Sequence, residues 1–457
     1  MSSPTRPARL PLSIAFLALL LACGDPSRGG LRPQGSGDGG ESEGEGESPN
    51  EGEGESAEGE GEEGEGEGEG EGEGEECGPT GQVPSPRSEQ VGIYDGERRR
   101  VVLYGGDNGA PIQCDPNPHM LNELWTFDTR CASFRQVRDA GRGPGNRSRG
   151  LAIHDTQRDR MIHFGGRSRD GAGGAYEVHN DVWALDLEEL EWGELETRGE
   201  PPSARHSTAG GYDSLNDMLI LFAGNTSTSG LEYRVTGGVH ALDLGNGRWE
   251  RVATVGRGPD NRLNHAAAVD AEAQKLYIYG GKHDFFGESF ADLWSLDLRT
   301  GEWEEHRPAS IFEPKPRFWP TLAFDPASKL LFMFGGHDDT AVGNNNDTWS
   351  FDPETSRWEV ITERSEINRP PNGDCNFPSD FVLPDSSAPE RRSAHMGSFD
   401  PVRGEWLIFG GKTDCGIIND VWVLTARTRA WTPLFRASAG ESCNRTRPAD
   451  ECFAMCM

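Results

Sequence analysis

One pattern recurs six times along this chain and constrains its fold more than any other feature. Each copy has an apolar run that ends in a glycine pair, an aspartate ten residues before the first glycine position, and an arginine eight residues before that aspartate. The arginines are Arg87, Arg147, Arg205, Arg262, Arg317 and Arg392. Six matches at fixed spacing indicate a repeat protein, in which each unit packs against its neighbours.

Every repeat is predicted to supply four short strands. The first runs from the arginine to the aspartate, as in residues 262 to 270, and the second is the apolar run before the glycine pair. The third carries a tryptophan, as in residues 292 to 297, and the fourth begins at an aromatic residue such as Trp303. The repeated aspartate opens a polar turn after the first strand. The chain is therefore expected to be all-β.

The arginine-led first strand, the glycine pair and the two spaced tryptophans resemble the kelch motif. The resemblance covers residues 87 to about 434 in six consecutive copies, and it implies a six-bladed kelch-type β-propeller with four-stranded blades around a central channel. The third copy departs from the motif at Ala223 and His240, and the sixth departs at Thr425. Because the copies run in phase, no strand exchange is needed to complete the last blade. We place the propeller at residues 78–434 and a cysteine-containing tail at 435–457.

Residues 1–22 have the features of a secretion signal. Arg6 and Arg9 precede an apolar run that is too short to span a bilayer. The following residues resemble the bacterial lipobox: Leu20, Leu21, Ala22 and Cys23. This resemblance implies cleavage before Cys23 and lipidation of its thiol, which would anchor the chain to a membrane; an ordinary signal peptide is the alternative. The predicted location is the bacterial envelope, as an exported lipoprotein of the outer membrane or cell surface.

Residues 23–77 form a Glu/Gly-rich linker with almost nothing to bury. From residue 24 to residue 77 it carries 20 acidic residues against two arginines, a net charge of −18 out of −32 for the chain. We expect this linker to be disordered and extended by charge repulsion, and loose divalent-cation binding is the alternative role. The acidic balance argues against nucleic acid as a partner, because phosphate binding requires a basic surface.

The cysteines predict disulfides. Nine are present, and eight remain if Cys23 carries lipid, an even number that predicts up to four bridges in an exported chain. A bridge from Cys77, before the first blade, to the group after the sixth would fasten the ring. That group is Cys443, Cys452 and Cys456. Cys375 and Cys415 are the preferred second pair, because their loops are expected on one face. The remaining connectivity is open.

The predicted binding face follows from strand direction. Strands alternate within a blade, so the loops before the first strand and after the glycine pair share one face, where kelch propellers often bind ligands. The resemblance makes these residues the ligand-binding candidates: Arg147, Arg205, Arg262, Arg317, Arg392, Arg167, Asn225, Lys282, His337 and Lys412. Their charge suits carboxylates, acidic peptides or anionic sugars. For the repeat arginines the alternative role is structural, as donors to carbonyl groups of neighbouring loops.

The sequence carries no motif that we recognise as catalytic or metal-binding, such as HExxH or Gly-x-Ser-x-Gly. We therefore predict no catalytic residue, metal or cofactor, and a monomeric recognition or scaffold module that binds a protein or glycan. The alternative is a carbohydrate-active kelch enzyme such as a sialic-acid mutarotase. In that case Arg205, Arg262 or Arg317 would bind the sugar carboxylate and Glu288 would act as acid/base. An oxidase similar to galactose oxidase is a weaker alternative, because its copper ligands cannot be placed here.

Overall fold

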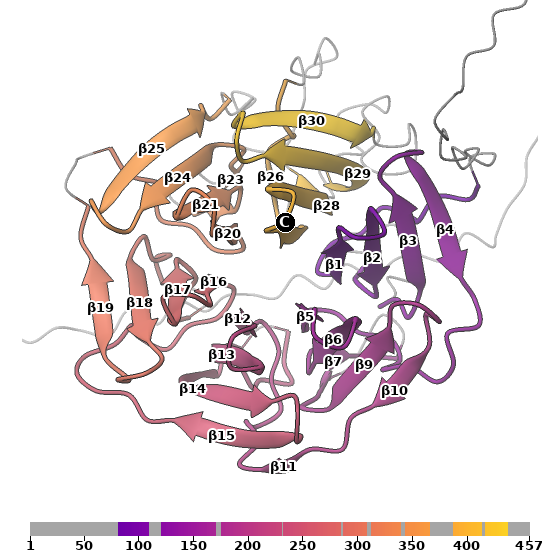
Figure 1. The fold of residues 1–457 in the computed structure, drawn as a ribbon, viewed down its shortest axis with the longest axis horizontal. Coiled ribbons are helices and arrows are strands. Elements are labelled where there is room, and N and C mark those ends of the chain that lie inside the picture. Colours follow the sequence, from indigo (N-terminus) through magenta and orange to yellow (C-terminus); the bar gives the residue numbers. More distant parts are fainter. Residues whose placement is uncertain are drawn as a thin grey trace, which may run out of the picture. The chain divides into compact units, whose positions relative to one another are not determined.

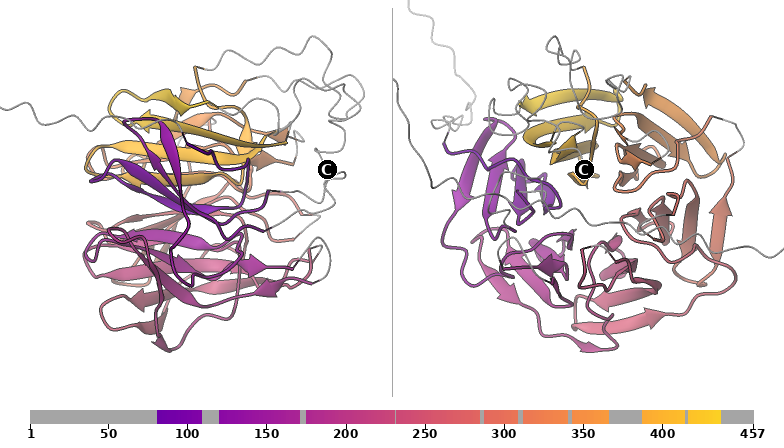
Figure 2. Two further views of the ribbon diagram at one scale, coloured as in Figure 1. Left: turned by 90° about the vertical axis from the view of Figure 1, so that its right-hand side faces the viewer. Right: turned by 180° about the vertical axis from the view of Figure 1, so that it is seen from behind.

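The computed structural model describes residues 81–108, 120–170, 175–230, 232–284, 287–308, 312–339, 343–365, 387–413 and 416–436. Six antiparallel sheets are arranged as blades around a central opening (Figure 1), which confirms the predicted six-bladed all-β propeller. The side view in Figure 2 shows loops at both faces of the ring. In these ranges there is no helix long and apolar enough to cross a membrane.

The first three blades each have four main strands, ordered from the centre to the rim. Blade 1 contains β1 (Val91–Asp95), β2 (Arg100–Tyr104), β3 (Leu124–Asp128) and β4 (Ser133–Val137). Blade 2 contains β5 (Leu151–Asp155), β6 (Arg160–Phe164), β9 (Val182–Asp186) and β10 (Trp192–Glu194), with the small hairpin β7 (Arg167–Ser168) and β8 (Glu177–Val178). Blade 3 contains β12 (Ala209–Asp213), β13 (Met218–Asn225), β14 (Val235–Asp243) and β15 (Arg248–Val252), and β11 (Arg198–Gly199) pairs with β15 in parallel.

The other three blades repeat the arrangement. Blade 4 contains β16 (Ala266–Asp270), β17 (Lys275–Tyr279), β18 (Leu293–Asp297) and β19 (Trp303–His306). Blade 5 contains β20 (Thr321–Asp325), β21 (Leu330–Phe334), β24 (Thr348–Asp352) and β25 (Arg357–Thr362), with the hairpin β22 (His337–Asp338) and β23 (Gly343–Asn344). Blade 6 contains β27 (Met396–Asp400), β28 (Glu405–Thr413), β29 (Gly416–Thr425) and β30 (Ala430–Phe435), and β26 (Arg392–Ser393) pairs with β28. Each blade is built from consecutive strands, as the phase of the repeats predicts.

The innermost strand of every blade is shorter than predicted. It ends at the aspartate, but it begins four residues after the arginine, as in blade 4, where β16 starts at Ala266 and not at Arg262. The cause is the residue two positions after each arginine, which has a positive φ, as in Asn264 with a φ of 56°. A left-handed residue cannot continue an extended strand. The arginine therefore lies before the innermost strand and not in it.

The repeated aspartates form the turns that the sequence predicts. In blade 5, Asp325 accepts hydrogen bonds from the backbone N–H groups of Ala327 at 3.0 Å and Ser328 at 3.2 Å. In blade 6, Asp400 accepts one from the N–H group of Val402 at 2.8 Å. These bonds satisfy the turn's backbone donors, which is why aspartate recurs there.

The glycine pairs join neighbouring blades. The second glycine donates its N–H group to the carbonyl oxygen of the next blade's arginine, as from Gly336 to Arg392 at 2.8 Å. The first glycine also lies against this carbonyl group. A Cβ added to Gly335 would be 2.8 Å from Arg392 O, which is too close for a side chain. The last such bond runs from Gly411 to Arg87 at 2.9 Å and closes the ring. Glycine recurs here because the backbone has a positive φ and another chain segment approaches it closely.

The apolar core lies between the blades. One cluster joins Val102 and Tyr104 of blade 1 to Met161 and Leu185 of blade 2, and another joins Phe332 of blade 5 to strands of blade 6. Each sheet is covered on both faces by its neighbours, so its second strand is mostly apolar, as the sequence predicts.

The predicted disulfide pairs lie outside the described residues. This applies to Cys77, Cys375, Cys415, Cys443, Cys452 and Cys456, and also to the lipidation residue Cys23. Cys131, which is described, takes part in a disulfide. Two side-chain hydrogen bonds join blade 6 to the start of blade 1. The Gln90 amide donates to Phe409 O at 2.8 Å, and the Asn419 amide donates to Pro84 O at 2.9 Å.

Candidate functional site

The repeat arginines lie inside the blades. Arg317 has an exposed fraction of 0% and donates two hydrogen bonds to Asp347, at 2.6 and 2.9 Å, and one to Gly335 O at 2.9 Å. The indole of Trp349 donates to the same carboxylate at 2.7 Å. Arginine, carboxylate and indole therefore form one buried unit that links the first glycine to the third strand.

Four other blades contain the same unit. Its members are Arg87, Glu123 and Trp125; Arg147, Asp181 and Trp183; Arg262, Asp292 and Trp294; and Arg392, Asp420 and Trp422. Blade 3 keeps Arg205, whose guanidinium donates to Ala223 O at 3.0 Å, but it has Gly238 and His240 at the other two positions. These contacts favour the structural role for the arginines over a direct role in ligand binding.

A closed ring of backbone hydrogen bonds encircles the central opening at the loop face. We call its six residues the collar: Glu89, Arg149, Ser207, Asn264, Trp319 and Ala394. Each stands two residues after a repeat arginine, and their φ values lie between 52° and 60°. The N–H group of each donates to the carbonyl oxygen of the collar residue in the preceding blade, at distances from 2.7 to 3.4 Å, and Glu89 completes the circle by donating to Ala394. The backbone is thus the same in all six blades, while the side chains differ completely.

Three cations surround the buried carboxylate of Glu89, whose side chain is 1% exposed. Arg149 contacts its two oxygens at 2.7 and 2.8 Å, Lys412 contacts it at 2.7 Å, and Arg167 at 3.3 Å. We call these four residues the central cluster. Three cations against one carboxylate leave it with a net charge of +2.

Aromatic rings extend the central cluster. The guanidinium of Arg149 and the ammonium of Lys412 each lie 4.9 Å from the ring centroid of Trp319. Arg167 lies 3.9 Å from the ring of Tyr176, which comes from the loop after the glycine pair of blade 2. Cation–π contacts of this kind hold both partners in place. The predicted basic loop face is therefore also aromatic.

The charges of the central cluster are fixed by their mutual contacts. Burial opposes ionisation of Glu89, but the charges of Arg149, Lys412 and Arg167 outweigh it and hold the pKa of Glu89 well below its usual range. Burial lowers the pKa of the neighbouring His206 well below its usual range, and Arg149 and Arg167 lower it further. Glu89 is therefore ionised and His206 is neutral at pH 7.

The remaining post-glycine candidates are not part of the central cluster. Lys282 forms an ion pair with Asp339 at 3.0 Å and lies 5.1 Å from the ring of Phe318. The Asn225 side chain accepts hydrogen bonds from two backbone N–H groups of its own loop, those of Ser227 and Arg234. The ring of His337 lies 3.3 Å from the amide oxygen of Asn344. Of the predicted residues, only Arg167 and Lys412 are brought together with the collar.

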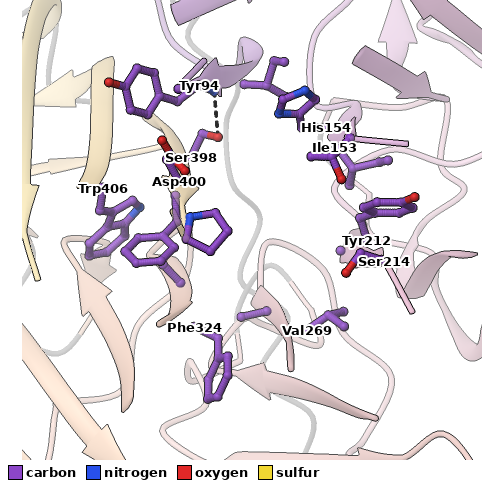
Figure 3. Close-up of a pocket in the computed structure, with 18 of the residues that line it drawn as sticks. Tyr94, Ile153, His154, Tyr212, Ser214, Val269, Phe324, Ser398, Asp400 and Trp406 are labelled. Atoms are coloured by element: carbon purple, nitrogen blue, oxygen red, sulfur yellow. Dashed lines mark hydrogen bonds between the residues drawn. The ribbon is translucent and has the colours of Figure 1, made fainter. Parts of the chain in front are cut away.

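The channel beyond the collar is a cavity of about 1160 Å³. Its wall consists largely of the inner strands and includes small residues such as Gly210 and Ala267. Figure 3 shows the labelled side chains around the opening, including Tyr94, His154, Tyr212, Phe324 and Trp406. Both tyrosine hydroxyls are hydrogen-bonded to carboxylates, that of Tyr94 to Glu405 at 2.8 Å and that of Tyr212 to Asp217 at 3.1 Å.

The residues nominated for the enzymatic alternative are dispersed. Arg262 and Arg317 are each paired with a carboxylate, and Glu288 is exposed on a loop of blade 4. Among the described residues, no group of three or more histidine, cysteine, aspartate or glutamate side chains is arranged to hold a metal ion.

Sequence reasoning missed Glu89, Arg149 and the collar. The available signal was the position two residues after each arginine, which holds a different residue type in every copy. A position that varies inside a strict repeat indicates recognition more directly than the arginine that never varies.

The fold is that of a β-propeller with a variable collar. The sequence profile of the KLHDC2/KLHL20/DRC7 Kelch-repeats domain matches residues 73–229 and 173–377, so the chain belongs to the kelch-repeat family. It is 30% identical over 292 residues to the acyl-CoA-binding domain-containing protein 5 of Arabidopsis thaliana, covering 63% of this chain but only 41% of that protein. It is 26% identical to Kelch domain-containing protein 2 of Bos taurus, covering 60% of this chain and 69% of that protein.

The solved structure of YjhT has a similar fold. The TM-score is 0.54 at 14% sequence identity, and the match covers 78% of this chain and 99% of that one. At this identity the similarity shows the fold alone.

Proposed function

We propose that this propeller is a non-catalytic recognition module that binds an anionic segment of a protein, or an anionic glycan, at the loop face. The kelch fold supports a protein-interaction role. The specific observation in favour of the loop face is the central cluster, where three cations and two aromatic rings surround one carboxylate. Its net positive charge contrasts with the net charge of −32 on the chain.

The collar supports the same proposal. A common backbone carries a different side chain in each blade, and those of Arg149 and Trp319 are partly exposed at the loop face, where a scaffold can acquire particular specificity. Arg149 and Lys412 are partly exposed beside Trp319. An incoming carboxylate can therefore contact these cations without displacing the buried side chain of Glu89.

Carbohydrate-active chemistry remains the second candidate. An acid/base pair and an arginine for the sugar carboxylate would be required, and Arg205 is the nominated arginine that has no carboxylate partner among the described residues. Its position in blade 3, away from the exposed Glu288 of blade 4, does not supply the acid/base pair.

The proposed membrane attachment concerns residues outside the described ranges. We propose lipidation at Cys23, a disordered acidic linker up to residue 77, and location in the bacterial envelope, all on the sequence features alone.

Binding is tested by saturation-transfer NMR on the full chain with three probes. The probes are a glutamate-rich peptide, a glutamine-rich peptide of the same length, and free sialic acid. We expect transfer to the glutamate peptide and to sialic acid, and little to the glutamine peptide, because the central cluster selects for negative charge. Lys412→Gln should weaken binding about tenfold, since a charge-assisted contact contributes about 1.5 kcal/mol.

Arg307→Gln is the matched control. Arg307 is 82% exposed beside Glu305, just past the rim strand of blade 4, and should bind the probes like the unchanged chain. Equal transfer to both peptides would overturn the proposed loop-face function. Faster exchange between the anomers of sialic acid, absent in Arg205→Gln, would instead establish the enzymatic alternative.

A further inference from the structure

Blade 3 lacks two members of the buried unit but keeps the third. The third strand has the same register as in the other blades, because His240 pairs with Leu221 just as Trp349 pairs with Met333. Gly238 therefore occupies the position of the carboxylate residue Asp347. Arg205 is placed like its counterparts, with its Nε donating to Ser203 O at 3.0 Å and one Nη to Ala223 O at 3.0 Å. Blade 3 therefore keeps the guanidinium group of Arg205 but has no carboxylate residue at the position that pairs with it in the other blades.

Arg205 is a buried cation without a counter-ion. It is 2% exposed, and within the described ranges it forms no ion pair with a carboxylate. Burial lowers the pKa of Arg205 to about 10. In blade 5 burial acts in the same direction on Arg317, but Asp347 outweighs it and raises the pKa. A buried unpaired charge is strongly unfavourable unless something compensates it.

A second guanidinium group lies beside Gly238, and both Arg205 and Arg251 act electrostatically on His240. Arg251 on β15 is exposed and stands opposite His240 in the strand pairing. An ideal Cβ on Gly238 would lie 3.5 Å from both Nε and Nη2 of Arg251, and 3.7 Å from Cε1 of His240. The other polar group is Nδ1 of His240, which is buried and has no hydrogen-bond partner. His240 itself is 9% exposed.

The local backbone keeps this position open. Gly238 has a φ of 88°, a conformation that a residue with a side chain rarely adopts. It is partly exposed, as are the preceding residues of β14. An internal carboxylate is therefore disfavoured here, while an external group can reach the position from solvent beside Arg251.

We propose that blade 3 contains a carboxylate-binding site, in which the carboxylate of a ligand takes the place that Asp347 holds in blade 5 and is held by Arg205 and Arg251. Two guanidinium groups suit a planar carboxylate, which each can contact with paired N–H donors. Because the ligand carboxylate would take the place of one aspartate carboxylate, we expect it at the end of a narrow group. This site is separate from the central cluster and does not depend on the proposed function.

The test compares acetate with acetamide, its neutral isostere, on the full chain at constant ionic strength. Acetate should raise the melting temperature by about 2 °C at ten times its dissociation constant, because ligand binding to the folded state stabilises it. Acetamide should not. Arg251→Gln should weaken the acetate response at least about tenfold, and because Arg251 is exposed the folded chain should be retained.

Two controls separate this site from others. Arg248→Gln changes another exposed cation of β15 and should leave the acetate response intact. Lys412→Gln weakens the central cluster and should also leave the response that depends on Arg251 intact. Equal responses to acetate and acetamide, or equal responses in Arg251→Gln and Arg248→Gln, would overturn the blade 3 site. Neither result would bear on the loop-face function, which is tested by the glutamate peptide.

Discussion

Lowering the pH from 7 to 5 is expected to reduce the free energy of unfolding by about 8 kcal/mol, through four buried histidines. They are His163, His206, His265 and His395, with exposed fractions from 0% to 6%. Burial, reinforced by a nearby arginine, lowers the pKa of His163 and of His265 to about 3, and it lowers those of His206 and His395 well below the usual range.

The sign follows from where each state binds protons. In the unfolded chain these histidines titrate near pH 6.5, so the unfolded state takes up protons as the pH falls below that value while the folded state does not. Stability is therefore complete above about pH 6.5 and is lost progressively as the pH falls toward 3. Each histidine contributes about 2 kcal/mol between pH 7 and pH 5. Carboxylates with lowered pKa values reduce the stability mainly below pH 5, where they begin to bind protons in the unfolded chain.

Urea denaturation at pH 7, 6 and 5 measures this loss. His163→Leu should reduce the loss by about 2 kcal/mol, since His163 is one of several histidines whose pKa is lowered by burial. Neither ring nitrogen of His163 has a hydrogen-bond partner to lose. His283→Gln is the control, since His283 is exposed and its replacement should leave the pH dependence unchanged. A stability that is constant from pH 7 to pH 5 would contradict the expectation.

Replacing Asp347 by alanine is expected to cost about 3–5 kcal/mol of unfolding free energy. The change leaves Arg317, with an exposed fraction of 0%, without its carboxylate, and leaves the indole of Trp349 without an acceptor. Urea denaturation at pH 7 gives the loss. Asp352→Ala is the matched control, because Asp352 is only partly buried and bonds its own turn, so its loss should cost about 1 kcal/mol.

The double variant Arg317→Met with Asp347→Ala separates the unpaired charge from other effects. If the cost comes from leaving the guanidinium unpaired, the double variant should be less destabilised than the sum of the two single variants. Additive costs would show that Arg317 and Asp347 stabilise the blade independently, contrary to the buried unit described above.

The sequence predicted the blades well because each depends on local spacing. The arginine, the aspartate turn and the glycine pair stand at fixed distances, and all six copies fold in phase. The structural role of the repeat arginine was harder to predict from the sequence. Its carboxylate partner lies 28 to 36 residues further along the chain, across loops of different length. The acid stands two residues before the tryptophan in five copies, but only the three-dimensional structure shows that arginine, acid and indole meet.

The collar could not be predicted from residue types. Its six positions share a left-handed φ, and glutamate, arginine and tryptophan are not residue types that indicate this conformation in a sequence. The start of the inner strand was misplaced for the same reason. The empty acid position of blade 3 was visible as Gly238 and His240, but its meaning depends on knowing where the acid belongs.

The collar holds the ring together through its backbone, while its side chains differ from blade to blade. Its hydrogen bonds join only backbone atoms, so they do not depend on which side chain a position carries. Side-chain changes at Ser207, Asn264, Trp319 or Ala394 therefore leave these hydrogen bonds in place, provided the new residue tolerates a positive φ, whereas changes at Glu89 or Arg149 also break buried ion pairs. The loop face can therefore differ in side chains between propellers that share the same backbone ring.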